Sequence, residues 1–135
     1  MLKLSKKSEY ALMAARYMAL QNNGNFVSAK EIAEDHNISY ELVSKVLQNL
    51  VKGNLVQSSQ GAKGGYSLKK SAFEIPLIDL IKAVEPNYQI TNCFGNDSSV
   101  MNCEHLDCCK IRDPLAEVQK KIDKVFLETK LSHIL

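Results

Sequence analysis

The sequence predicts a mainly α-helical fold of the winged helix-turn-helix class, and three observations support this prediction. Two short amphipathic segments with capping signals follow one another over residues 28–53. A glycine-bearing hairpin pattern comes directly after them, over residues 54–70. A long amphipathic segment begins near residue 111 and runs toward the C-terminus. We therefore expect a helix pair with a small β-hairpin wing, joined to a long C-terminal dimerisation helix.

The first two helices are defined by apolar periodicity and by a capping signal. One helix is expected over residues 6–21, where "NNGN" ends the pattern. Its apolar face is centred on Tyr10, Ala14, Tyr17 and Met18. The next begins after Ser28, which has capping-box spacing to Glu31, and runs about two turns to His36. Asn37 then makes the turn.

The third helix, residues 40–53, is the one expected to read DNA. Ser39 can cap it and Gly53 stops it. Its inward apolar stripe consists of Leu42, Val43, Val46, Leu47 and Leu50. Because DNA meets the residues that the core does not need, we predict one set of DNA-binding residues on the helix pair and the wing. This set is Ser28, Tyr40, Ser44, Lys45, Gln48, Lys52, Gln60 and Lys63.

The hairpin wing and the charge distribution favour an anionic partner. Leu55 and Val56 lead into the hairpin, Gly61, Gly64 and Gly65 permit its turn, and Tyr66 and Leu68 lead out. Residues 1–70 carry ten Lys and Arg against five Asp and Glu, whereas residues 71–135 carry seven against ten. This asymmetry suggests an anionic partner for the first part, nucleic acid being the usual one. The order of helix pair and wing makes double-stranded DNA the expected partner.

The second half contains a short helix and a long one. Pro76 opens the short helix and Pro86 ends it, with an apolar face of Leu77, Leu80, Ile81 and Val84. Asp113 and Pro114 start the long helix, whose heptad-like seam is Ile111, Leu115, Val118, Ile122 and Val125. Lys120, Lys121, Asp123, Lys124 and Glu128 are expected to face away from the seam. The seam predicts a homodimer; a core helix within one monomer is the alternative.

All four cysteines lie between these two helices, with the spacing C-x9-C-x4-C-C: Cys93, Cys103, Cys108 and Cys109. The spacing does not match paired C-x2-C zinc knuckles. From the residues alone, an iron-sulfur cluster, a zinc ion and thiol redox sensing all stay open. No secretion signal or membrane span is visible in the sequence, so we expect a cytoplasmic protein that does not bind membranes.

The order of motifs resembles the Rrf-two (Rrf2) family of bacterial winged-helix regulators, of the IscR and NsrR type. The resemblance rests on "LSKKSEYALMAARYMA", on "SAKEIAEDHNISYELVSKVLQNLVKGNLVQSSQGAKGGYSL", and on "IPLIDLIKAVEP" followed by a cysteine loop and a final helix. It implies a homodimeric transcription factor, usually a repressor, controlled by an iron-sulfur cluster of the 2Fe-2S or 4Fe-4S type. The implied division is a DNA-binding domain (1–86), a cluster-binding loop (87–110), and a dimerisation helix with its tail (111–135).

The resemblance also implies the metal ligands. Position by position, Cys93, Cys103 and Cys109 match the family's three cysteines, and Cys108 is an extra thiol. Arg112 stands where IscR-like members have a ligating histidine. Glu9, before Tyr10, matches the acidic fourth ligand that NsrR-like members supply from the other subunit, with His105 and Cys108 as competitors.

Two other functions are alternatives to a cluster-dependent regulator. The first is a regulator of the same fold that uses zinc or cysteine oxidation. The second is an enzyme with a cysteine nucleophile and His36, His105 or His133 as its base. No nucleophile elbow, phosphate loop or orienting constellation accompanies these residues, so the chain is predicted not to be an enzyme.

Overall fold

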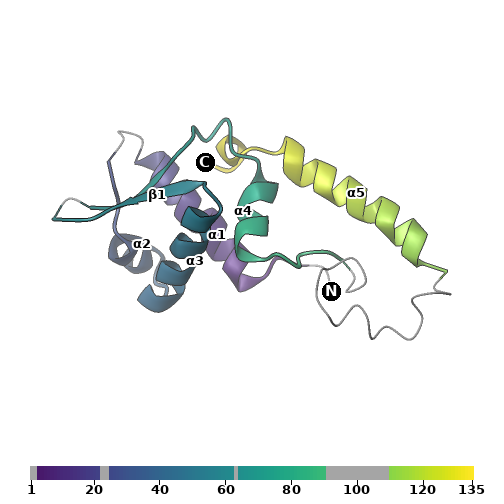
Figure 1. Ribbon diagram of the computed structural model, residues 1–135, viewed down its shortest axis with the longest axis horizontal. Helices are drawn as coiled ribbons and strands as arrows, with labels where there is room; N and C mark the ends of the chain where they lie inside the picture. Colours follow the sequence, from purple (N-terminus) through teal and green to yellow (C-terminus); the bar gives the residue numbers. More distant parts are fainter. Residues whose placement is uncertain (1–2, 22–24, 63, 91–109) are drawn as a thin grey trace.

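The computed structural model describes residues 3–21, 25–62, 64–90 and 110–135 (Figure 1). Its elements follow the predicted order, and the bounds below are those of the structure. They are α1 (Lys6–Leu20), α2 (Ala29–His36), α3 (Tyr40–Lys52), β1 (Val56–Ser59), β2 (Gly65–Leu68), α4 (Leu77–Val84), α5 (Arg112–Glu128) and the 3-10 helix η3 (Leu131–Ile134). The mainly helical fold with a hairpin wing is therefore confirmed.

The core forms where α1, α3 and α4 pack against one another. Small residues of α1, Ala11, Ala14 and Ala15, are almost fully buried and allow the neighbouring helices to approach closely. The predicted centre of this face is therefore partly wrong. Met18 is buried as expected, but the rings of Tyr10 and Tyr17 are only half-buried against the core.

The turn between α2 and α3 has the predicted geometry. The Ser28 hydroxyl accepts a hydrogen bond from the backbone N–H of Glu31 at 3.0 Å and caps α2. Asn37 takes the left-handed conformation with φ of 53°. Ser39 does precede α3, but its side chain makes no capping hydrogen bond to that helix, so the predicted cap is wrong.

Two details of α3 also differ from the prediction. The buried stripe consists of Val43, Val46, Leu47 and Leu50, whereas 46% of Leu42 is exposed. At 3.6 residues per turn, Leu42 lies about 90° from the centre of this stripe, too far around the helix to reach the core. Gly53 follows the helix, but its φ is −76°, and the left-handed residue is Asn54 with φ of 64°. A Cβ on Gly53 would lie 3.1 Å from the Ala83 Cβ, so its small size allows α4 to approach.

The wing is fixed to the helix pair by backbone pairing. β1 and β2 are antiparallel, with Val56 opposite Leu68 and Ser59 opposite Gly65. Tyr66 exchanges two backbone hydrogen bonds with Val27, of 2.7 and 2.9 Å, just before α2 begins. Gly65 has φ of 145°, and a Cβ there would overlap the Val27 carbonyl oxygen. The hairpin is thus held in one position relative to the helix-turn-helix.

Of the C-terminal elements, α5 extends from the packed helices and η3 packs back against their core. In Figure 1, α5 extends away from the packed helices, and the chain end lies close to them. Leu131 in η3 is fully buried in the core, and its N–H donates to the Ile75 carbonyl at 2.8 Å. Arg16 Nε donates to the Ile134 carbonyl at 3.0 Å. The predicted division at residues 86 and 110 stays a prediction, but the tail packs with the DNA-binding unit.

None of the helices in the described ranges is both long enough and apolar enough to span a bilayer.

Candidate nucleic-acid interface and thiol segment

The outer side of α3 brings several predicted DNA-binding residues together. Lys45, Gln48 and Lys52 are exposed on the side opposite the buried stripe. Tyr40, at the start of the helix, is 58% exposed. This surface presents an amide and two cations, which are the groups that bind base edges and phosphates respectively.

Ser44 behaves differently from its neighbours on α3. Its hydroxyl oxygen is buried and has no hydrogen-bond partner within the described part of the chain. A contact between this hydroxyl and a base edge therefore requires the side chain to rotate toward the surface. The exposed side chains of Leu42 and Tyr40 add apolar surface to α3 outside its buried stripe. Leu42 was not predicted to lie on the exposed surface, because the sequence pattern assigned it to the buried stripe.

The remaining predicted contacts lie around α3. The Ser28 hydroxyl already caps α2, so any contact with DNA would share that oxygen. Gln60 is exposed at the tip of the hairpin, and Lys63 lies outside the described residues. Lys69, at the base of the wing, donates to the Asn54 side-chain oxygen. The wing therefore presents polar groups beside α3, as a DNA clamp requires.

The predicted cysteine ligands cannot be placed. Cys93, Cys103, Cys108, Cys109 and His105 all lie outside the described residues. Among the residues that are described, no group of three or more His, Cys, Asp or Glu side chains is arranged to hold a metal ion. The structure does place the two ends of the segment, Ile90 before it and Lys110 after it.

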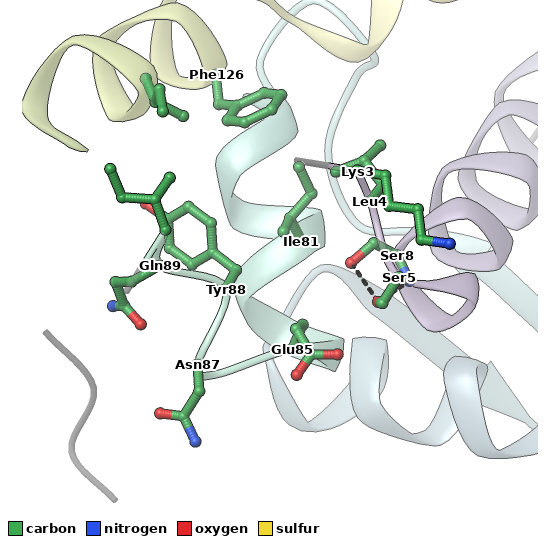
Figure 2. A pocket seen from close by; sticks show the side chains of 12 residues that line it. Lys3, Leu4, Ser5, Ser8, Ile81, Glu85, Asn87, Tyr88, Gln89 and Phe126 are labelled. Carbon is green, nitrogen blue, oxygen red and sulfur yellow. Dashed lines mark hydrogen bonds between the residues drawn. The ribbon is translucent and has the colours of Figure 1, made fainter. Parts of the chain in front are cut away.

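A cavity of about 530 Å³ lies at the junction from which this segment leaves (Figure 2). The N-terminal part of α1, the last turn of α4, residues 87–90 and α5 form its walls. Its lining combines apolar side chains, including Ile81 and Phe126, with polar groups of Ser5 and Ser8. Ser5 caps α1 by accepting a hydrogen bond from the Ser8 N–H at 3.1 Å.

Glu9, the predicted fourth ligand, lies in the first turn of α1 and outside the lining of this cavity. Its carboxylate pairs with the Lys6 ammonium at 3.1 Å. The Lys6 side chain is largely exposed, so this pair stabilises the fold only weakly. Breaking it to free the carboxylate for another partner therefore costs little.

A polar network that the sequence pattern did not predict joins residues 87–90 to α5. The Ile90 N–H donates to Gln119 Oε1 at 2.8 Å, and Gln119 Nε2 donates to Asp123 Oδ1 at 2.8 Å. The Tyr88 hydroxyl donates to the same oxygen of Asp123. Burial, reinforced by the Asp123 carboxylate, raises the pKa of Tyr88 well above its usual range, so the phenol stays a donor. Asp123 lies away from the seam, as predicted, and its carboxylate faces residues 87–90 of its own chain.

Comparison with known proteins identifies the chain. A family model described as "Iron-dependent Transcriptional regulator" matches residues 4–135. The chain belongs to the Rrf2 family. This confirms the resemblance inferred from the order of motifs, and it places the helix pair and wing in a DNA-binding transcriptional regulator.

Curated relatives of this Rrf2 protein include transcriptional regulators. NsrR of Halalkalibacterium halodurans is 30% identical over 116 residues, which are 86% of this chain and 78% of that protein. IscR of Pectobacterium atrosepticum is 33% identical over 108 residues, or 80% of this chain and 63% of that protein. Because such relatives are regulators, the prediction that this Rrf2 protein is not an enzyme is confirmed.

Two solved structures share the fold of this chain. T. potens IscR has a TM-score of 0.71 at 27% identity, over 98% of this chain and 85% of that chain. CymR, the global cysteine regulator of B. subtilis, has a TM-score of 0.74 at 23% identity, over 99% of this chain and 96% of that one. At that identity the likeness to CymR shows the fold alone.

Proposed function

We propose that this Rrf2 protein is a homodimeric repressor whose affinity for its operator is set by an iron-sulfur cluster, 2Fe-2S or 4Fe-4S. Cys93, Cys103 and Cys109 would hold the cluster, and Glu9 of the second subunit would complete the site. Thiolates are soft donors, and three of them on one segment suit such a cluster. When bound, the cluster supplies a cross-link that oxygen, nitric oxide or shortage of iron removes.

One observation carries this proposal: both ends of the thiol segment are fixed to α5. Cys93 follows Ile90 by three residues, so its Cα lies within about 11 Å of the Ile90 Cα. The Ile90 N–H is bonded to Gln119, in the middle of α5. Cys109 is joined directly to Lys110, two residues before α5 begins. The described residues that flank the first and last cysteines are therefore both attached to α5, which supports a shared site for these thiols.

The exposed seam of α5 supports the homodimer. Ile111, Val118 and Val125 are 62%, 41% and 60% exposed, respectively, although their spacing is that of a buried seam. A second copy of α5 would cover these side chains through a two-fold interface. Two copies of α3 would then contact successive major grooves of a palindromic operator.

The exposed residues of α3 and of the wing would contact different groups of the DNA. Gln48 is suited to a base edge, with Ser44 joining it after side-chain rotation, and Lys45 and Lys52 to phosphates. Gln60 and Lys63 at the wing would contact the backbone or the minor groove. Because the heads are rigid units, a change at the α5 seam alters the distance between two DNA-reading surfaces. A coupling of about 1–3 kcal/mol between the thiol site and the operator is enough for a switch.

Anaerobic purification with iron, sulfide and zinc quantification tests the proposal. We expect brown protein with visible absorption, which Cys103→Ala abolishes. Cys108→Ala is the matched control, because this thiol is not a ligand in the proposed site, and it should keep the colour. Colourless wild-type protein without iron contradicts the proposal.

The adjacent thiols of Cys108 and Cys109, together with Arg112 at the position of a family histidine ligand, favour one alternative. In that alternative, zinc or cysteine oxidation sets the operator affinity. The same preparation distinguishes it, because stoichiometric zinc, or mass-spectrometric oxidation of these two thiols, would appear in place of iron and sulfide.

A further inference from the structure

We propose that the Gln119 network, made of Tyr88, Ile90, Gln119 and Asp123, transmits the state of the thiol segment to α5 and thereby to the DNA-reading heads. The inference rests on the proposed function. It assigns Gln119 as a positioning residue, not as a ligand or a DNA contact.

Gln119 is suited to this role because both ends of its amide are used. Its oxygen accepts from the Ile90 N–H, and its nitrogen donates to the Asp123 carboxylate. Gln119 is only 7% exposed and is the buried polar residue of α5. A buried amide that is bonded at both its oxygen and its nitrogen favours one geometry, because losing either bond leaves a buried polar group unpaired.

The network joins two parts of the chain that are distant in sequence, and one of them also contacts α4. Tyr88 and Ile90 follow α4, while Gln119 and Asp123 lie on α5. The Lys82 ammonium, on α4, lies 5.8 Å from the centre of the Tyr88 ring. Tyr88 also forms part of the cavity wall, where it projects beside Ile81 (Figure 2). The residues just before the thiol segment are therefore attached both to α4 and to α5.

The position of the network makes it a point of coupling. Gln119 lies seven residues after Arg112, or about 10 Å along the helix axis from the start of α5. The thiol segment thus leaves α5 at one point, through Ile90, and rejoins it about 10 Å or more away, through Lys110. If the thiols bind a cluster, we expect the force that the segment exerts on these two attachments to change. A covalent attachment holds at Lys110, so the hydrogen-bonded attachment at Ile90 is the one that can change.

The α5 helix has a second anchorage that stays fixed. At its C-terminal end, the Thr129 carbonyl accepts from the Leu77 N–H at 2.9 Å, and Leu131 is buried in the core. A helix held firmly at one end and through a polar network midway along its length changes its direction when the network changes. The seam residues near the start of α5 would move most.

Three variants test the role of Gln119. Gln119→Leu removes both hydrogen bonds at similar volume, and Tyr88→Phe removes only the hydroxyl, so it is the variant to use if Gln119→Leu does not fold. Lys120→Leu is the matched control, because Lys120 is the exposed neighbour of Gln119 on α5. The DNA probe is a duplex selected by the wild-type protein from a random-sequence pool.

The measurements are iron and sulfide per chain, the ratio of operator affinities with and without iron and sulfide, and hydrogen exchange at the Ile90 amide. We expect Gln119→Leu to bind as much iron and sulfide as the wild type. Hydrogen exchange at its Ile90 amide should be at least tenfold faster, and its ratio of operator affinities should be at least fivefold smaller. Tyr88→Phe should show a smaller loss, and Lys120→Leu none.

The two proposals fail in different ways. An unchanged affinity ratio in Gln119→Leu, beside a clear ratio in the wild type, overturns the role of the network and leaves the proposed function standing. A wild-type protein that takes up no iron and sulfide, or whose operator affinity does not respond to them, overturns the proposed function and the role of the network with it.

Discussion

The helices α3 and α5 are both amphipathic, but they use their apolar stripes differently. In α3, Val43, Val46, Leu47 and Leu50 are all buried inside the same chain. In α5, the seam residues Ile111, Val118 and Val125 are exposed, and the buried residue is polar Gln119. An apolar stripe therefore predicts that a face will be covered, but it does not tell whether the cover comes from the same chain or from another.

The cause of the difference lies in what each helix packs against. The α3 helix packs against α1, α2, α4 and β1, which supply apolar side chains on several sides. The α5 helix contacts α4 and extends from the packed unit (Figure 1). Its side toward its own chain carries the Gln119 network together with Ile122 and Phe126. These polar and apolar contacts hold α5 to its own chain, and Ile111, Val118 and Val125 of the seam stay exposed.

The largest expected effect comes from truncating the α3 stripe. Leu47→Ala should lower the free energy of unfolding by about 2–5 kcal/mol, because Leu47 is fully buried and the change leaves a cavity. Leu127→Ala is the matched change on α5, where the side chain is exposed and lies away from the seam, and should cost about 0.5 kcal/mol or less. Urea unfolding followed by circular dichroism measures both. Equal losses would show that α5 is packed as tightly as α3.

A second test acts on the α5 seam. Val118→Asp with Val125→Asp should weaken the proposed dimer by about 100-fold or more, because each buried carboxylate would lack a partner. Analytical ultracentrifugation measures the dissociation constant. The free energy of unfolding of the separated monomer should change little, since both valines are exposed in the single chain.

The control for this test is Lys120→Asp, which places the same side chain on the opposite side of α5. It should leave the dissociation constant within about threefold of the wild type. A monomeric wild-type protein, or a dimer that the two seam changes leave intact, would assign the exposed valines to something other than self-association.

The sequence predicted the parts of the molecule that are determined locally. Ser28, Asn37 and Pro76 act on backbone groups a few residues away, so their positions predicted the bounds of α2 and α4 well. The Gln119 network was missed because it joins residues about thirty positions apart, and periodicity placed Asp123 away from the seam without showing what its carboxylate contacts. Leu42 was misassigned because a run of apolar residues does not show where the buried stripe ends.

The features of the candidate site that depend on residue type could also be predicted, whereas those that depend on packing could not. The sequence predicted the chemistry that depends on residue type. Three thiols suggested a soft-metal ligand set, and lysines expected on the surface suggested phosphate contacts. Spacing alone did not choose between iron-sulfur, zinc and thiol oxidation. The family resemblance favoured the cluster, because it matched whole segments and not single residues. The enclosed hydroxyl of Ser44 depends on how α3 packs, which no local pattern contains.

The smallest expected effect concerns the N-terminal caps of α2 and α3. It tests whether a cap stabilises α3 in addition to the buried apolar stripe. Ser28→Ala should cost about 1 kcal/mol, because it removes the side-chain acceptor that caps α2. Ser39→Ala, at the equivalent position before α3, should change the free energy of unfolding by only a few tenths of a kcal/mol, since the Ser39 side chain makes no capping bond. Urea unfolding of the two single variants measures the difference. If Ser39→Ala costs as much as Ser28→Ala, a cap forms in solution and α3 depends on its first turn as well as on Val43, Val46, Leu47 and Leu50. If the two differ as expected, burial of the apolar stripe accounts for the position of the DNA-reading helix without a cap, whereas α5 is held to its own chain by the Gln119 network and by the buried Leu131 that follows it.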